Sequence, residues 1–565
     1  MGTAWFRRND CHDPRDTVRG GYDPTPYLRL LNKMSENNPW WKSGVLYQVY
    51  PRSFQDSDGD GVGDLRGILR RLPYLASLGI DALWLSPMFP SPMDDFGYDI
   101  SDYTDIDPLF GTLEDFDALV AAAHGQGLKV ILDLVPNHTS DRHPWFVESS
   151  SSRDNPKRDW YIWRDGRGEG EPPNNWLSEF GGSSWEPDSA TGQFYYHAFL
   201  RSQPDLNWRN PEVRSAIHDV MRFWLRHGVD GFRVDVMWHL IKDELLRDNP
   251  ANPDYMPEAG QQPYQQLLPI YSTDRPEVHD VVAELRQVID EFSDRVLIGE
   301  IYLPPEKLVA YYGENLAGAH LPFNFALIST PWTASAVAML IDTYEAALPR
   351  GAWPNWVLGN HDRQRIASRI GDDRVRVAAM LLLTLRGTPT LYYGDEIGMP
   401  QATIASDQVR DPWETNLPGL GLGRDGCRTP MQWDATSKAG FSDGEPWLPL
   451  GPDLAICNVA AETGDPASVL SLHRALIALR RTTPELAIGD YSQVEAAGDL
   501  LAYERSHQGQ RVLVVLNFGR TPVSFDASRW TGHILLSTDM NREGETVTGT
   551  LPLRASEGIV VRLST

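Results

Sequence analysis

The sequence has 565 residues and a formal net charge of −26, because 77 Asp and Glu outnumber 51 Lys and Arg. Such an acidic chain repels the phosphates of nucleic acids and anionic lipids, so we expect neither a nucleic-acid partner nor a membrane partner. It has no run of about 18 apolar residues, which a membrane-spanning helix needs. Its N-terminus lacks the apolar stretch of a secretory signal. Its three cysteines, Cys11, Cys427 and Cys457, are too few for a disulfide framework and favour a cytoplasmic location.

Short apolar runs alternate with amphipathic helical patterns from Val45 onward. The runs are nearly continuous in apolar residues, as expected for parallel strands that are buried on both faces. We predict eight strands, at residues 45–50, 82–87, 130–135, 231–236, 296–301, 321–325, 355–360 and 390–394.

Helices are predicted between these strands. The helix after Thr112 begins with a capping box that pairs Thr112 with Asp115. The helix after Asn210 has Pro211 in its first turn and Gly228 at its end. Eight strands separated by helices indicate an α/β fold of the (β/α)8 TIM-barrel type.

Two segments depart from this alternation. The third and fourth strands are separated by about 100 residues, too many for a structureless loop, which indicates an inserted subdomain after strand 3. After the last predicted helix, near 468–482, alternating runs around a turn at Gln508 and Gly509 predict a C-terminal all-β domain. We therefore expect an N-terminal extension at 1–38, a barrel formed by 39–138 and 209–484, an inserted domain at 139–208 and a β-sandwich at 485–565.

Ionisable side chains collect at the carboxyl ends of the predicted strands, where TIM barrels hold their catalytic groups. Arg233 and Asp235 are two positions apart on the fourth strand and therefore point to the same side. A single acid in such a place is more often a helix cap or half of a salt bridge, but the whole set indicates an active site. Its members are Asp133, His138, Arg233, Asp235, Glu300, His361 and Asp362.

Four segments at these strand ends resemble the four conserved segments of the α-amylase family, glycoside hydrolase family 13. They are DLVPNH at 133–138, GFRVDVMWH at 231–239, GEIYLP at 299–304 and LGNHD at 358–362. Further family-like segments extend the resemblance from about residue 40 to the C-terminus. Within the family, the chain is most similar to bacterial α-glucosidases and oligo-1,6-glucosidases, to which the inserted domain and the RTPMQWD run at 428–434 also point.

The resemblance implies a retaining mechanism in which Asp235 is the nucleophile, Glu300 the general acid/base and Asp362 the transition-state stabiliser. Physical chemistry is consistent with these three roles. Arg233 favours the ionised form of Asp235, whereas Glu300 has to begin protonated, which nearby carboxylates and apolar walls favour. An ionised Asp362 stabilises the positive oxocarbenium-like centre.

The resemblance also implies a pocket that is closed around one terminal glucose. Asp95 would pair with Arg428 to close the pocket end, which restricts attack to the non-reducing terminus, and Tyr98 would stack on the sugar ring. His138 and His361 would donate to sugar hydroxyls. The substrate-binding candidates are Asp95, Tyr98, His138, Phe180, Arg233, Val236, His361 and Arg428.

Linkage preference depends on the residue after the nucleophile, Val236. In the resembling group, Val at this position accompanies a preference for α-1,6 bonds, whereas Ala or Thr accompanies α-1,4 bonds. The Ile-Asn pair common in oligo-1,6-glucosidases is replaced here by Met237 and Trp238, and this departure leaves the nature of the subsite for the leaving sugar open.

An acidic loop follows the first strand. The side chains of Asp56, Asp58, Asp60 and Asp64 and the carbonyl of Val62 place oxygen atoms at alternate positions, a spacing that lets one loop wrap a hard cation. A Gly-rich acidic turn without a metal is the alternative. The resembling glucosidases bind Ca²⁺ here, so a structural Ca²⁺ is the one cofactor implied, and we expect no organic cofactor.

We therefore expect an exo-acting, retaining α-glucosidase for short oligosaccharides, with α-1,6 bonds preferred, acting as a monomer or small homo-oligomer. A trehalose- or sucrose-isomerising transglucosidase would use the same catalytic residues, so the sequence separates these two functions poorly. A non-catalytic relative, like the heavy subunits of amino-acid transporters, is disfavoured because Asp235, Glu300 and Asp362 are all present.

Overall fold

The computed structural model describes residues 38–564, and the chain divides into two compact units between Trp40 and Trp41. The predicted N-terminal extension therefore lies outside the described residues, except for its last residue. Eight parallel strands form one sheet in the second unit, and a parallel bridge between Asn324 and Trp356 joins its two edges into a barrel. The sheet order is β10 (Asn355–Val357), β11 (Thr388–Tyr392), β1 (Leu46–Val49), β2 (Ala82–Leu85), β3 (Lys129–Leu134), β7 (Gly231–Val234), β8 (Val296–Gly299) and β9 (Leu321–Pro322).

All eight predicted strands are present, and the predicted TIM barrel is confirmed. The residues of β1, β2, β7 and β8 are buried throughout, as the continuous apolar runs indicated. Helices follow most of the strands. They include α4 (Leu65–Leu78), α5 (Leu113–Gly125), α7 (Pro211–Arg226), α8 (Val278–Asp290), α11 (Ala334–Ala347), α13 (Val375–Thr384) and α16 (Val469–Thr482).

Local signals in the sequence determine where two of these helices begin. The Thr112 hydroxyl accepts from the Asp115 N–H at 3.2 Å, and the Asp115 carboxylate accepts from the Thr112 N–H at 3.1 Å, which is the predicted capping box of α5. The Asn210 side chain accepts from the Glu212 N–H at 2.8 Å and caps α7. Both helices therefore start where their sequences predict.

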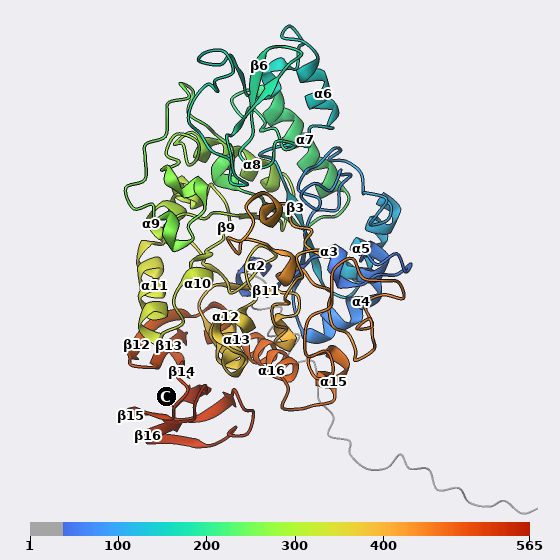
Figure 1. Ribbon diagram of the computed structural model, residues 1–565. Helices are drawn as coiled ribbons and strands as arrows, with labels where there is room; N and C mark the ends of the chain where they lie inside the picture. Colours follow the sequence, from blue (N-terminus) through green and yellow to red (C-terminus); the bar gives the residue numbers. More distant parts are fainter. Residues whose placement is uncertain (1–37, 565) are drawn as a thin grey trace, which may run out of the picture. The chain divides into compact units, whose positions relative to one another are not determined.

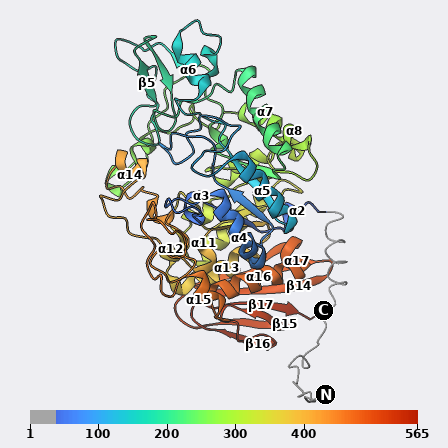
Figure 2. The same ribbon diagram turned by 90° about the vertical axis from the view of Figure 1, so that its right-hand side faces the viewer.

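The segment between β3 and α7 is folded and lies over the carboxyl ends of the barrel strands. It contains α6 (Pro144–Ser151) and a three-stranded antiparallel sheet of β4 (Trp163–Arg164), β6 (Gln193–Tyr196) and β5 (Trp185–Asp188). Figures 1 and 2 show this insert at one end of the second unit and the C-terminal strands at the opposite end. Its aromatic residues bury one another in a small core of Ile162, Trp176, Trp185, Phe194, Tyr196 and Ala198.

The C-terminal strands form one continuous antiparallel sheet, which confirms the predicted all-β domain. The long strand β15 pairs with both β16 and β17, so hydrogen bonding continues through all six strands. Side chains alternate between the faces: Leu501 and Tyr503 pack in the cluster that includes the barrel, and Leu500 and Ala502 pack in a second core. The order is β12 (Asp490–Ala497), β13 (Leu500–His507), β14 (Gln510–Asn517), β17 (Gly558–Leu563), β15 (Val523–Ser537) and β16 (Thr546–Leu553).

Within residues 38–564, no helix combines the length and the apolar character that crossing a bilayer requires.

Candidate active site

Arg233 lies among three carboxylates at the carboxyl ends of neighbouring barrel strands. Its fully buried guanidinium donates from Nη1 to Asp133 Oδ1 and Asp235 Oδ1, both at 2.7 Å. Its Nη2 forms an ion pair with Glu300 Oε2 at 2.8 Å. Asp133 stands on β3, Asp235 follows β7 and Glu300 follows β8, and these strands are adjacent in the barrel. One cation therefore holds three acids in fixed positions.

The carboxyl groups around Arg233 compete for ionisation. Burial, and next the negative charge of Glu300, raise the pKa of Asp235 well above its ordinary value, although Arg233 opposes the shift. Burial raises the pKa of Asp133 to about 6, against the same arginine. The negative charge of Glu300 therefore disfavours a second negative charge on Asp235, as expected for two carboxyl groups that share one site.

The residue after Asp235 has a backbone conformation that β-branched residues rarely adopt. Val236 has φ 36° and ψ 47°, which lies in the left-handed region and stores strain. In this conformation its N–H donates to Glu300 Oε2 at 2.9 Å. The strained residue therefore joins the ends of β7 and β8 and orients the Glu300 carboxylate.

Asp362, which follows β10, is held by two arginines. Its Oδ1 lies 2.9 Å from Arg428 Nη2 and 3.3 Å from Arg424 Nη1, and its Oδ2 lies 3.3 Å from His361 Nε2. Burial opposes ionisation, but the neighbouring imidazole and both guanidinium groups lower the pKa of Asp362 far below its ordinary value. Burial lowers the pKa of His361 well below its ordinary value, so this imidazole is neutral at neutral pH. The positive charges that lower the pKa of Asp362 are therefore those of the two arginines. Asp362 is therefore ionised at neutral pH.

Asp95 pairs with Arg424, so the predicted Asp95–Arg428 pair was wrong. Arg424 Nη2 lies 2.7 Å from Asp95 Oδ1 and 2.7 Å from Asp411 Oδ1, whereas Arg428 pairs with Asp362. The two arginines stand at either end of a short 3₁₀ turn, η9 (Asp425–Cys427), which lets them reach different acids. The spacing along one loop gave no means of telling which arginine meets Asp95.

Phe180, the predicted sugar contact in the insert, stacks on Trp413 with ring centroids 5.2 Å apart. The guanidinium carbon of Arg424 lies 5.4 Å from the Phe180 ring and 5.5 Å from the Trp413 ring. Aromatic faces attract a guanidinium group. The insert therefore helps to hold Arg424 against Asp95.

Tyr98 and two histidines are coupled by hydrogen bonds. The Tyr98 hydroxyl lies 2.7 Å from His361 Nε2 and 3.0 Å from Asp133 Oδ2, and its ring is stacked parallel to the His361 imidazole. His138 Nε2 lies 3.1 Å from the Tyr98 carbonyl oxygen, and burial lowers the pKa of His138 to about 4. Both imidazoles are therefore neutral at neutral pH and available as hydrogen-bonding groups.

A cavity of about 330 Å³ brings most of the predicted residues together, a volume at the lower end of the range for small-ligand sites. Of the predicted residues, Asp95, Tyr98, His138, Phe180, Asp235, Val236, Glu300, His361 and Asp362 line it. Arg233 and Arg428 contact these lining residues but are themselves fully buried.

The sequence did not single out several other residues of the cavity wall. Trp238, Tyr302 and Arg363 each follow a predicted catalytic acid by three positions or fewer, and that proximity is the signal that could have found them. No such signal marks the residues that come from distant loops, because only folding brings these to the barrel. They are Glu179, Phe199, Gln262, Tyr264, Gln265, Pro269, Thr273, Trp413 and Arg424.

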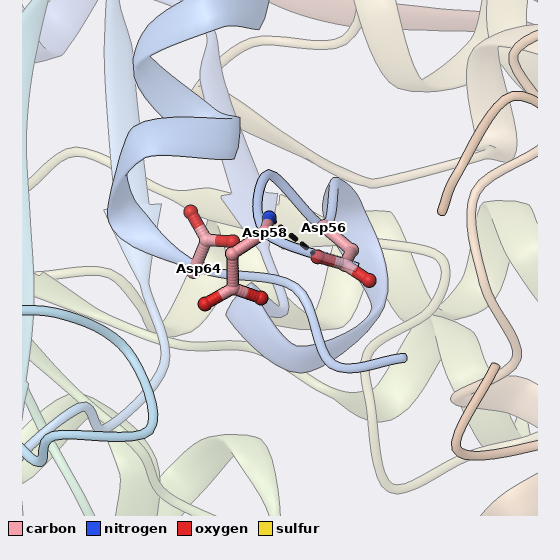
Figure 3. A group of neighbouring side chains, drawn as sticks. All are labelled: Asp56, Asp58 and Asp64. Atoms are coloured by element: carbon pink, nitrogen blue, oxygen red, sulfur yellow. Dashed lines mark hydrogen bonds between the residues drawn. The ribbon is translucent and has the colours of Figure 1, made fainter. Parts of the chain in front are cut away.

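The acidic loop before α4 gathers three of its four aspartates. Oxygen atoms of Asp56, Asp58 and Asp64 lie within 4.8 Å of one another, and Figure 3 shows Asp58 between the other two. Asp60 lies outside this group, and its Oδ1 accepts from the Val62 N–H at 2.8 Å. Three hard carboxylate donors on one loop fit a cation such as Ca²⁺.

Two family models match the chain. Residues 48–489 match the alpha amylase catalytic domain, and residues 491–556 match the C-terminal domain of maltogenic amylase. The chain is 45% identical over 500 residues to a probable α-glucosidase of Rhizobium meliloti, covering 86% of this chain and 90% of that protein. It is 39% identical over 537 residues to an oligo-1,6-glucosidase of Parageobacillus thermoglucosidasius, covering 88% and 93%. The solved structure of the trehalulose synthase of Pseudomonas mesoacidophila is 37% identical, with a TM-score of 0.86 over 94% of this chain and 100% of that chain.

Proposed function

The chain belongs to the α-amylase family of glycosidases, and on that premise we propose that it is a retaining, exo-acting α-glucosidase of short oligosaccharides. It releases the terminal non-reducing glucose and prefers α-1,6 bonds. The observation that carries this proposal is the geometry at Arg233, which lies 2.7 Å from Asp235 and 2.8 Å from Glu300 beside a cavity that also holds Asp362.

In this proposal, the Asp235 carboxylate attacks the anomeric carbon while the bond to the glycosidic oxygen breaks. Glu300 gives its proton to that oxygen, and the leaving sugar departs. A water molecule then loses a proton to Glu300 and attacks the glycosyl–Asp235 ester, which releases glucose with its anomeric configuration retained. Asp362 remains ionised and stabilises the positive charge that develops on the sugar.

Exo attack is supported by the buried ion pair of Asp95 and Arg424. Both side chains line the cavity, and each is less than a tenth exposed. They offer a charged acceptor and charged donors to the hydroxyls of one glucose unit, and such charge-assisted hydrogen bonds are the strong ones. Asp411, on the other side of Arg424, keeps the guanidinium in place.

The α-1,6 preference is supported by the position of Val236. Its side chain lines the cavity beside Asp235, close to where the scissile bond has to lie. An added or missing methyl group in such a wall changes substrate discrimination by about tenfold or more. The similarity to a protein named oligo-1,6-glucosidase points the same way.

A second candidate is an isomerising transglucosidase, in which a sugar hydroxyl replaces water in the second step. The similarity to a trehalulose synthase favours it, and the catalytic residues are the same in both reactions. The two candidates differ in what the glycosyl–enzyme intermediate reacts with, so only the products separate them.

One experiment tests both candidates. The enzyme is incubated with isomaltose, maltose, panose, trehalose and sucrose, and the products are followed by NMR. We expect free α-glucose as the first product and a kcat/KM for isomaltose at least equal to that for maltose. A clear excess for maltose contradicts the α-1,6 preference, and disaccharide isomers as main products favour the transglucosidase.

We also propose that the acidic loop binds a structural Ca²⁺ through Asp56, Asp58 and Asp64. The loop is tied to the segment after the RTPMQWD run, because the Asp56 N–H donates to the Phe441 carbonyl at 3.0 Å and the Ser442 hydroxyl donates to Asp56. A cation here would hold the two segments together. It lies outside the catalytic cavity, so no reaction step depends on it.

We propose further that the enzyme works in the cytoplasm as a monomer or small homo-oligomer. The location is supported by Cys427 and Cys457, which are free thiols and suit a reducing compartment.

A further inference from the structure

Glu179 places a carboxylate in the active-site cavity that the proposed reaction does not use. It comes from the insert, next to Phe180, lines the cavity, and has a side chain that is 18% exposed. Its backbone is anchored on both sides: the N–H donates to the Ala198 carbonyl at 2.9 Å, and the carbonyl accepts from Trp413 Nε1 at 3.0 Å. These two bonds fix the place from which the carboxylate enters the cavity.

The Glu179 carboxylate accepts no hydrogen bond from any residue between 38 and 564. The buried imidazole of His239 is a close neighbour, with its Nε2 3.4 Å from Glu179 Oε1. A partly buried carboxylate without donors is costly, since such groups are normally satisfied by protein, water or ligand. Its free acceptor positions are therefore available to a ligand in the cavity.

Ring contacts link Glu179 to the residues beside Glu300: Glu179 Oε1 lies 3.4 Å from His239 Nε2, the His239 ring lies 4.8 Å from the Trp238 ring, and Trp238 lies 5.8 Å from Tyr302. The charge of Glu179 acts on Arg363, whose guanidinium carbon lies 5.1 Å from the Tyr302 ring centroid. Tyr302 stands two residues after Glu300, the group that protonates the leaving oxygen in the proposed mechanism. Glu300, Tyr302, Arg363 and Glu179 all line the cavity, and we assign this part of the wall to the leaving sugar because Glu300 protonates the oxygen that departs with it.

We propose that Glu179 is a specificity-determining residue that accepts hydrogen bonds from hydroxyl groups of the leaving sugar. This inference rests on the proposed α-glucosidase function. A carboxylate accepts from two hydroxyls at once, offers nothing to an aryl ring and repels an anion. The substrate class that Glu179 selects is therefore an α-glucoside whose leaving group is neutral and carries several hydroxyls.

The test compares kcat/KM for isomaltose and for p-nitrophenyl α-glucoside, which share the glucose and differ in the leaving group. We expect Glu179→Leu to lose about tenfold or more on isomaltose, as for a lost hydrogen bond to a charged group, but no more than about threefold on the aryl glucoside. Glu179→Gln should lie between, because the amide keeps an acceptor and lacks the charge. Glu169→Gln, at an exposed acid of the same insert, is the matched control and should change neither value.

Equal losses on both substrates, or no loss on isomaltose, would overturn the role of Glu179. Retained turnover of the aryl glucoside shows that the variant is folded and that the glucose subsite is intact. If the unaltered enzyme releases glucose from neither substrate, the α-glucosidase proposal itself fails, and this outcome is distinct from the failure of the Glu179 proposal.

Discussion

Arg424 Nη2 lies 2.7 Å from Asp95 Oδ1, although 329 positions separate the two residues in the sequence. Asp411 and Asp362 also contact this guanidinium, so one arginine serves three acids. Burial raises the pKa of Asp95, and Arg424 opposes that shift. Each charge of the pair is therefore stabilised by the other, and removing one partner leaves the remaining buried charge with fewer opposite charges around it.

Asp95→Asn tests the pair as the part of the pocket that holds the terminal glucose. We expect kcat/KM to fall by about a hundredfold on isomaltose and on p-nitrophenyl α-glucoside alike, because both present the same glucose to this pair. Steady-state kinetics on the two substrates measure it. Asp94→Asn, at the exposed neighbouring acid, is the control and should leave both values unchanged. A loss confined to one substrate would contradict the assignment.

Asp235→Asn should abolish turnover, by about 10⁴-fold or more, and leave the protein folded. The pKa of Asp235 in the folded protein is raised, so the stability contributed by its proton is lost as the pH rises through that pKa. Asn cannot ionise. We therefore expect the thermal midpoint of the variant to equal or exceed that of the unaltered protein at neutral pH, with the difference vanishing near pH 4. A lower midpoint at neutral pH would speak against this account.

Asp133→Asn should move the acid limb of the pH profile. The Asp133 charge raises the pKa of Asp235, which has to be ionised for attack. Removing that charge lowers the pKa of Asp235, so kcat/KM should persist to a lower pH. The measurement is kcat/KM for the aryl glucoside as a function of pH. An acid limb that stays in place or moves to higher pH would refute the coupling.

Val236→Ala enlarges the cavity beside the scissile bond. We expect the ratio of kcat/KM for isomaltose to that for maltose to fall by about tenfold, which is the discrimination that one or two methyl groups provide. Competition between the two disaccharides in one reaction, with products resolved by NMR, measures the ratio directly. An unchanged ratio would assign the linkage preference to other residues of the wall.

Removal of divalent cations should destabilise the protein through the acidic loop. If Ca²⁺ binds at Asp56, Asp58 and Asp64, a hundredfold excess over its dissociation constant stabilises the fold by about 3 kcal/mol, so a chelator should lower the thermal midpoint and added Ca²⁺ should restore it. Asp58→Asn should weaken this response, whereas Asp105→Asn, at an exposed acid of another loop, should not. Metal analysis that finds no cation, together with no shift on chelation, would count against the site.

The barrel could be predicted from the sequence because the signals for its helices and strands are local, each acting over a few residues. The Thr112–Asp115 capping box and the Asn210 cap start their helices where expected, and a continuous apolar run such as β8 has to be buried on both faces. The C-terminal strands were also predicted, but not their union in one sheet. That union depends on β15 pairing with two partners, which no local pattern encodes.

By itself, the sequence determined which residues stand at the ends of the strands, since Arg233, Asp235 and Glu300 belong to short motifs. In a barrel of parallel strands, the carboxyl ends of all strands lie on one face. Only the tertiary structure decided which partners those residues meet. Arg424 rather than Arg428 reaches Asp95, and Glu179 enters the cavity from the insert. These contacts join loops that are far apart in the chain, so they follow from the packing of the whole domain and not from any periodicity along it.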